Sequence, residues 1–235
     1  MKWQQVHHGH LYFKSMSQHF IDLIKQGATK DIAAEVEAHP EVAASRDTQG
    51  VSALMWAIYT RQTVLRDFLL SGLEHIDVFE SAAVGDCDRL KALLRADATL
   101  ARTTSTDGWP PLHLAAAFGT PEAVTVLLEH GAHVHEISRN AMRNQALNAC
   151  VALGQSIDTA RLLIEAGADT CFAQPGGYGP LHQAAANGNT DMVKLLLQNG
   201  SKPDQRCDRG KTPEDYAVER NHTEVIALLR GARTV

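Results

Sequence analysis

The sequence predicts an all-α solenoid of stacked helix-turn-helix units, with short β-hairpin-like turns between them. Three observations predict it. A stretch of two short helices, each ended by a glycine, recurs along the chain. The apolar residues of these helices fall on one face at helical spacing. Helices this short are marginal alone, so each unit needs neighbours that bury its apolar face.

The clearest unit spans Asp107–Ala132. Its Asp-Gly pair predicts a turn, because Gly108 can take a positive φ at no steric cost. Pro111 suits the first position of a helix, where its missing N–H has no partner in any case. We expect this first helix to continue through Phe118 and to end at Gly119, as helices do at a C-terminal glycine.

The second helix of this unit has its own start and stop residues. Thr120 is expected to cap it, Pro121 occupies its first position, and Gly131 closes the unit. Four apolar residues share one face at helical spacing: Ala123, Val124, Leu127 and Leu128. The two helices together therefore present an apolar face that a neighbouring unit can cover.

The same unit recurs after residue 138. Gly176–Ser201 repeats it almost residue for residue at a constant distance of 69 positions. Gln145–Asp169 is a drifted copy, with Asn148 where the other copies have histidine and about three extra residues. Asp208–Leu229 is the last copy, and its polar substitutions predict a C-terminal cap at 206–233.

A period of about 33 residues, with Pro-Leu-His at 111–113 and 180–182 and a Leu-Leu-x-x-Gly ending, resembles the ankyrin repeat. Before residue 100 the resemblance rests on spacing, because apolar residues and glycines recur 58 positions later. The Pro-x-apolar-Ala linkers are similar to those of bacterial ankyrin proteins. The resemblance implies a single domain over 16–235 with about seven repeats, near residues 17–46, 47–75, 76–106, 107–137, 138–173, 174–205 and 206–233.

Residues 1–15 look foreign to this pattern. A broken histidine run precedes Leu-Tyr-Phe-Lys-Ser and then Met16, which resembles a polyhistidine expression tag with a protease linker, although Lys14 replaces the expected glutamine. A native N-terminal arm is the alternative. We expect a tag or leader and exclude these residues from the fold prediction.

Composition and charge narrow the class of protein. The chain has 235 residues, 44% of them hydrophobic, and a net charge of −5. Mild acidity argues against non-specific nucleic-acid binding, which needs clustered Lys and Arg. No apolar run is long enough for a membrane span. The four cysteines are scattered and favour single thiols in a reducing compartment. We therefore expect a cytoplasmic, monomeric protein without cofactors.

Two groups of histidines have different interpretations. His113 and His182 match the histidine of the ankyrin motif, which typically ties neighbouring turns together by hydrogen bonds. His130, His133 and His135 form a group that could ligate zinc, although no cysteine or carboxylate completes the set at ligand spacing and Glu136 alone is weak. A metal or small-molecule binding module using these three residues is therefore the alternative function.

No recognised catalytic motif occurs in the sequence, so we expect a protein that is not an enzyme, with an enzyme or its accessory module as a further alternative. The resemblance implies that a partner protein binds in the concave groove formed by turn tips and first helices. Large apolar residues at groove positions are the predicted partner-binding residues: Tyr59, Trp109, Phe118, Met142, Leu153 and Tyr178. Trp109 and Phe118 are the expected anchors, because aromatic residues dominate binding hot spots.

Overall fold

The computed structural model describes residues 16–154 and 156–232. The predicted leader at 1–15 lies outside these residues. The chain divides into two compact units at Ile76–Asp77, called unit 1 and unit 2. The single domain over 16–235 therefore stays a prediction.

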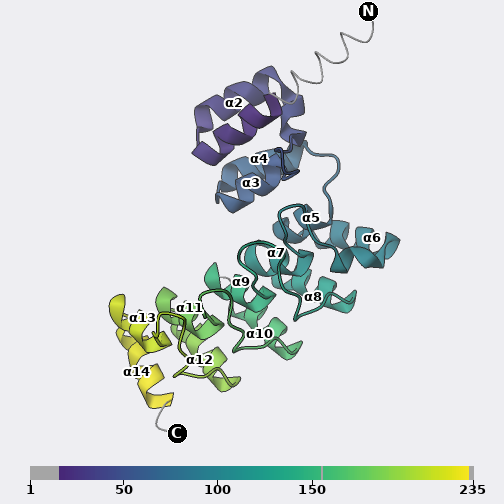
Figure 1. Cartoon of the computed structure of the whole chain (residues 1–235). Helices are drawn as coiled ribbons and strands as arrows, with labels where there is room; N and C mark the ends of the chain where they lie inside the picture. Colours follow the sequence, from purple (N-terminus) through teal and green to yellow (C-terminus); the bar gives the residue numbers. More distant parts are fainter. Residues whose placement is uncertain (1–15, 155, 233–235) are drawn as a thin grey trace, which may run out of the picture. The chain divides into compact units, whose positions relative to one another are not determined.

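Unit 1 contains two consecutive helix pairs (Figure 1). Residues 16–26 are helical and precede α2 (Thr29–Ala38), which leads into the short 3-10 helix η1 (Pro40–Ala44). The second pair is α3 (Ala53–Tyr59) and α4 (Thr63–Gly72), which pack together. Each pair falls in one of the first two predicted repeats. The core includes five fully buried side chains: Phe20, Ile21, Ile24, Leu54 and Leu69.

Unit 2 has five helix pairs in its described residues. They are α5 (Val78–Val84) with α6 (Cys87–Ala96), α7 (Pro111–Phe118) with α8 (Pro121–Glu129), α9 (Ala146–Ala152) with α10 (Ile157–Glu165), α11 (Pro180–Asn187) with α12 (Thr190–Gln198), and α13 (Pro213–Glu219) with α14 (Thr223–Ala232). The 3-10 helix η2 (Ala98–Arg102) follows α6.

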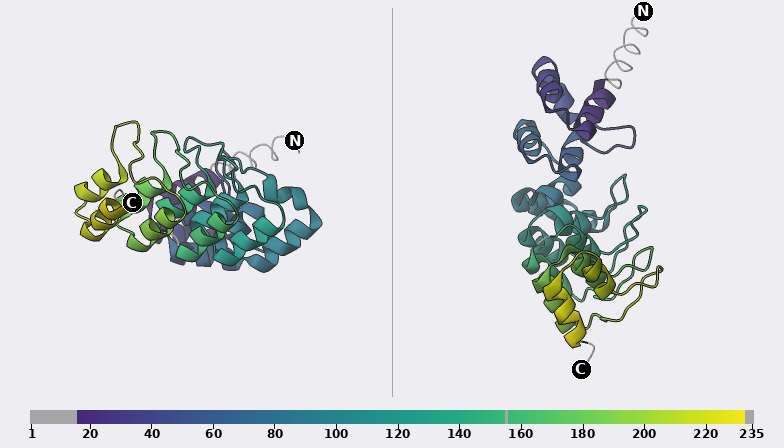
Figure 2. Two further views of the ribbon diagram at one scale, coloured as in Figure 1. Left: turned by 90° about the horizontal axis from the view of Figure 1, so that it is seen from below. Right: turned by 90° about the vertical axis from the view of Figure 1, so that its left-hand side faces the viewer.

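The pairs of unit 2 stack in two layers. The first helices contact one another in the order α5, α7, α9, α11, α13, and the second helices in the order α6, α8, α10, α12, α14. Figure 2 shows the loops between pairs projecting on one side of these layers. The all-α solenoid predicted from the sequence is confirmed for this unit, and the described residues contain isolated bridges but no strand.

Five of the loops between helix pairs have the predicted hairpin-like form. In each, the N–H of one residue donates to a carbonyl further along the same loop, at 2.9–3.0 Å. The bonds run from Asp47 to Val51, Ser105 to Trp109, Ser138 to Asn144, Gln174 to Tyr178 and Cys207 to Lys211. Four of these loops therefore have equal length, and the loop of the drifted copy is two residues longer.

The predicted start and stop residues of α7 and α8 have one exception. Thr120 caps α8, its hydroxyl accepting from the N–H of Ala123 at 3.2 Å, and proline begins both helices. Gly119 follows α7 as expected but does not adopt the left-handed conformation, since its φ is −84°. A Cβ there would lie 2.3 Å from the carbonyl oxygen of Ala82. Glycine is therefore required by the close approach of α5.

Small and large apolar residues have different positions in the core. The alanine pairs of α7 and α11 are almost fully buried, which lets the first helices approach closely. In the second helices, Leu127 and Leu196 are completely buried, whereas Leu128 and Leu197 are only half-buried. One leucine of each pair therefore carries most of the packing between second helices.

This difference gives a test of the core. Leu196→Ala should lower the free energy of unfolding by about 2–5 kcal/mol, because it removes a buried side chain and leaves a cavity. Leu197→Ala, the matched control on the same helix, should cost distinctly less. Urea unfolding followed by circular dichroism measures both, and equal losses would contradict the assignment of Leu196 to the core.

Candidate protein-interaction surface

Two helix pairs of unit 2, α7 with α8 and α9 with α10, are each joined to the next hairpin loop by a hydrogen bond. His113, the third residue of α7, has its Nε2 2.9 Å from the carbonyl oxygen of Asn144. A carbonyl only accepts, so Nε2 is the donor and the imidazole is neutral or positively charged. Asn144 closes the following hairpin. The predicted role of His113 as a tie between neighbouring turns is confirmed.

Asn148 makes the same tie with a different side chain. It is the third residue of α9, and its Nδ2 donates to the carbonyl of Phe172 at 3.1 Å. Its Oδ1 accepts from the N–H of Gln145 at 3.4 Å, as Nδ1 of His182 accepts from Gly179 in α11. The amide in the drifted copy therefore reproduces the hydrogen bonds of the histidine without a group that titrates near neutral pH.

Burial of His113 determines its charge. Desolvation lowers the pKa of its imidazole from 6.5 to about 4, and the hydrogen bond to Asn144 offsets only part of this effect. Burial also lowers the pKa of His182. Contacts with the main chain of Lys211 and Gln205 raise this pKa, but by less than burial lowers it. Both histidines are therefore neutral at physiological pH.

Trp109 is held in its own hairpin, directly before α7. The N–H of Trp109 donates to Oγ of Ser105 at 2.9 Å, and its carbonyl closes the hairpin. Its indole ring is half-buried and lies 6.1 Å from the imidazole of His113, centroid to centroid. The ring thus lies next to a buried, neutral side chain and is itself partly exposed.

The other predicted binding residues of unit 2 form two rows, one at helix ends and one on hairpins. Phe118 and Leu153 are half-buried and lie at the C-terminal ends of α7 and α9, which pack together. Met142 and Tyr178 lie on hairpins, Met142 with 46% of its surface exposed and Tyr178 half-buried. Stacking therefore places apolar side chains along the hairpins and along the helix ends of unit 2.

Tyr59 is not part of this arrangement, because it belongs to unit 1. It is the last residue of α3, is half-buried, and its ring stands edge-on to Trp56 at 5.8 Å. Its membership of a partner-binding surface stays a prediction.

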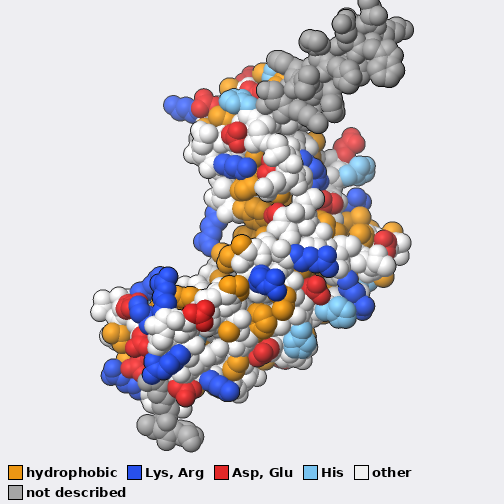
Figure 3. Space-filling view, in the orientation of Figure 1, with side chains coloured by type: hydrophobic (Ala, Val, Ile, Leu, Met, Phe, Trp, Pro, Cys, Tyr) orange, Lys and Arg blue, Asp and Glu red, His pale blue; other side chains and the backbone are white. Residues whose placement is uncertain are grey.

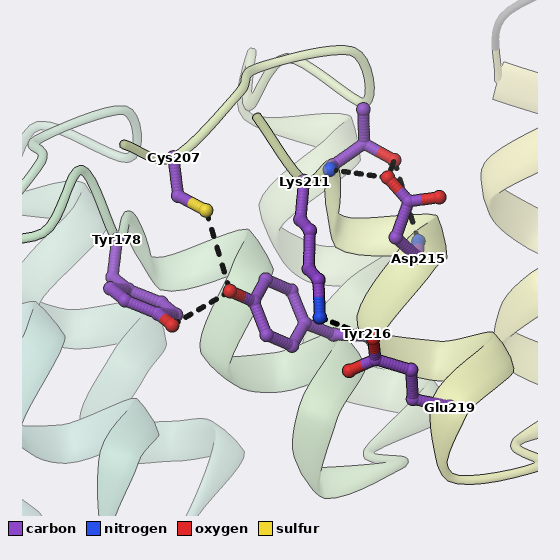
Figure 4. A network of polar contacts seen from close by, with 7 residues as sticks. Tyr178, Cys207, Lys211, Asp215, Tyr216 and Glu219 are labelled. Carbon is purple, nitrogen blue, oxygen red and sulfur yellow. Dashed lines mark hydrogen bonds and ion pairs between the residues drawn. The ribbon is translucent and has the colours of Figure 1, made fainter. Parts of the chain in front are cut away.

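Tyr178 takes part in a polar cluster that the sequence analysis does not predict (Figure 4). The hydroxyl of Tyr216, on α13, donates to that of Tyr178 at 2.7 Å and lies 3.3 Å from the Cys207 thiol. Lys211 contacts the ring of Tyr216 and pairs with Glu219. Burial and these hydrogen bonds raise the pKa of Tyr216, so its hydroxyl stays protonated. The cluster fixes the Tyr178 ring in place.

The histidine group proposed for zinc does not form a ligand set. His130 bonds through Nδ1 to the carbonyl of Val126 at 2.7 Å, which engages one of its two ring nitrogens. His133 and His135 lie in the loop that follows. Within the described part of the chain, no three His, Cys, Asp or Glu side chains are placed to hold a metal ion. The described residues therefore give the metal-binding alternative no ligand set, and the small-molecule alternative is not tested.

A comparison with protein families identifies the repeats of unit 2. The family model described as ankyrin repeats (3 copies) matches residues 78–174 and 170–234. These ranges cover the five helix pairs of unit 2.

Curated relatives are similar over different lengths. Ankyrin repeat and SOCS box protein 16 is 38% identical over 46% of this chain in mouse and 32% identical over 84% in human. The matched regions span only 25% and 44% of those proteins. Human cyclin-dependent kinase 4 inhibitor B is 37% identical over half of this chain and 83% of its own length. These mammalian relatives do not test the predicted bacterial type.

Hydropathy supplies one more finding. None of the helices in the described residues has the length and apolar character to span a bilayer.

The buried tie predicts a pH dependence of stability. His113 takes up its proton at a lower pH when folded than when unfolded. The contribution of neutral His113 to the free energy of unfolding is therefore complete above about pH 6.5. It is lost as the pH falls towards about 4, and the loss is up to about 3 kcal/mol. His113→Asn, which introduces the side chain that Asn148 has at the equivalent position, should remove this loss. The measurement is urea unfolding at intervals from pH 7 to pH 4.

His133→Asn is the control, because it replaces an exposed histidine. This variant should follow the wild type across the pH range. If the wild type and His113→Asn lose stability in parallel, His113 is not the group responsible.

Proposed function

The chain belongs to the ankyrin repeat family, and we propose that it is a non-enzymatic scaffold that binds a partner protein through its concave groove. Ankyrin repeats generally mediate protein–protein interactions. The observation that carries the proposal is the pair of rows in unit 2, where Trp109, Phe118, Leu153 and Tyr178 are half-buried and Met142 is exposed.

The physical argument concerns the state of these side chains before binding. A half-buried aromatic ring has already lost most of its rotational freedom, so little entropy is lost when a partner covers it. Trp109 is held by its hairpin and by His113, and Tyr178 by Tyr216. Aromatic residues that are held in place at the centre of a surface, next to a flexible side chain such as that of Met142, are typical of binding hot spots. A standard interface over them would bury about 1,200–2,000 Å² in total.

A relative supports the choice of a protein as partner. Cyclin-dependent kinase 4 inhibitor B is named for its action on another protein, and this chain covers 83% of it. We therefore expect a protein partner rather than a nucleic acid.

We further propose that the helix pairs of unit 1 are ankyrin repeats, which gives about seven in the chain. Both pairs have the predicted positions, and the hairpin from Asp47 to Val51 closes as the hairpins of unit 2 do. On this proposal residues 16–235 are one domain of bacterial type, with a cap at 206–233 where Glu219, Arg220 and Asn221 are exposed. A cytoplasmic monomer is proposed as well, since all four cysteines are free thiols.

The binding proposal predicts a separation of affinity from stability. Trp109→Ala and Met142→Ala should each weaken partner binding, Trp109→Ala by about tenfold or more, while the melting temperature stays nearly unchanged. The measurement is an affinity pull-down from lysate of the native host, followed by titration of the retained protein.

Val218→Ala is the matched control. Val218 on α13 is 47% exposed, like Met142, but lies in neither row. The control should retain the partner at wild-type level. A large loss of stability in Trp109→Ala, or equal retention by all variants, would contradict the proposed surface.

A further inference from the structure

The hairpin of the drifted copy breaks a rule that the other hairpins follow. In the other four hairpins, a glycine with positive φ precedes the residue that closes the hairpin. This hairpin has Arg143 at that position, with φ of +39°. The four glycines are Gly50, Gly108, Gly177 and Gly210. A side chain in this conformation is strained, and such strain concentrates at functional sites.

Hydrogen bonds hold this longer hairpin in shape. Ser138 Oγ donates to Asn140 Oδ1 or Asn144 Oδ1, at 3.1 and 3.0 Å, and accepts from the N–H of Asn144 at 3.1 Å. Asn140 Oδ1 also accepts from the N–H of Met142 at 3.0 Å. The turn therefore presents the exposed side chains of Met142 and Arg143 next to each other on a fixed backbone.

Positive charge gathers on the tips of these hairpins although the chain is acidic overall. Arg139, Arg143 and Arg209 are exposed and, within the described residues, form no ion pair. The acids among the tips of unit 2 are Asp107 and Asp208, and Oδ1 of Asp208 lies 2.8 Å from where a Cβ on Gly177 would be. Glu136 and Asp204 precede the tips in sequence. The tips of unit 2 thus carry these three arginines and two carboxylates.

An open recess lies beside Arg143. It has a volume of about 430 Å³, and its apolar lining includes Ile137, Phe172 and Pro175, with Arg143 and Asp208 as its charged residues. Figure 3 shows basic and hydrophobic side chains next to one another over unit 2. The recess therefore offers an apolar floor beside an unpaired guanidinium group.

We propose that this recess and Arg143 bind an extended segment of the partner protein, in which a carboxylate residue stands next to a large apolar residue. The apolar side chain enters between Ile137 and Phe172, and the guanidinium of Arg143 pairs with the carboxylate, a geometry suited to two parallel hydrogen bonds. Arg139 and Arg209 attract the acidic segment. This inference rests on the proposed function and names the chemistry of the partner.

The experiment uses a displayed library of random decapeptides, selected on the full chain. Selected peptides should carry Asp or Glu adjacent to Leu, Ile, Phe or Met. Arg143→Gly should weaken their binding by about fivefold or more, with the urea midpoint nearly unchanged, because glycine is the residue of the other four hairpins. Arg143→Lys, which keeps the charge but not the planar fork, should give an intermediate affinity.

Arg161→Gln is the control, because it removes one positive charge, as Arg143→Gly does. Arg161 is exposed on α10, in the layer of second helices, and its loss should not change peptide binding. Affinity for the wild type should fall as sodium chloride rises, since exposed charges are screened. A labelled 20-nucleotide single-stranded DNA is the second probe, and it should bind more weakly than the peptides.

Three results would overturn the inference: no enrichment of acidic residues, equal binding by Arg143→Gly, or DNA that displaces the peptides. The proposed function is tested separately, by Trp109→Ala. If peptides lose affinity with Trp109→Ala but not with Arg143→Gly, the groove binds a protein segment and the recess does not read its carboxylate.

Discussion

The hydrogen bond from the third residue of a first helix to the next hairpin is the interaction on which unit 2 depends. Each hairpin projects from the helical layers and has no sheet to satisfy its main chain, so an unpaired buried carbonyl would cost stability. His113 and Asn148 each supply the missing donor from the preceding helix. Because each donor is part of a packed helix, the positions of these two hairpins follow from the positions of α7 and α9.

Contacts between successive hairpins complete this alignment. The N–H of Arg139 donates to the carbonyl of Gly108 at 2.8 Å, and that of Asp208 to the carbonyl of Gly176 at 3.0 Å. A Cβ on Gly108 would lie 2.6 Å from the main-chain nitrogen of Asn140, so a side chain there would push the hairpins apart. The glycines of the turns therefore serve the approach of neighbours as well as the turn itself.

Local sequence determines much of this fold. Proline, threonine and glycine mark the ends of α7 and α8, and the spacing of leucine and alanine shows which faces pack. These features act within a few residues, so they can be predicted without coordinates. Gly119 is the informative exception. Its position is predictable, but the reason for it is contact with Ala82 in another helix pair, which local sequence does not contain.

The candidate surface is less predictable for the same reason. Family resemblance locates Trp109 and Tyr178 on hairpins, but exposure depends on neighbours far along the chain. Tyr216 is 38 residues from Tyr178, and its hydroxyl contact exists only because α13 stacks on α11. A tyrosine at that position of the last copy, where the other copies have Leu114 and Gln183, is the one indication in the sequence.

Stability alone does not account for the irregular hairpin. A glycine in place of Arg143 would relieve the positive φ, and the positive charges of Arg139 and Arg143 on one short turn repel each other. The hydrogen bonds of Ser138 and Asn140 offset these costs without requiring an arginine. A local rule broken with no gain inside the fold is typical of residues that act on something outside it. The proposed binding of a negatively charged group of a partner accounts for both the strain and the exposed charge.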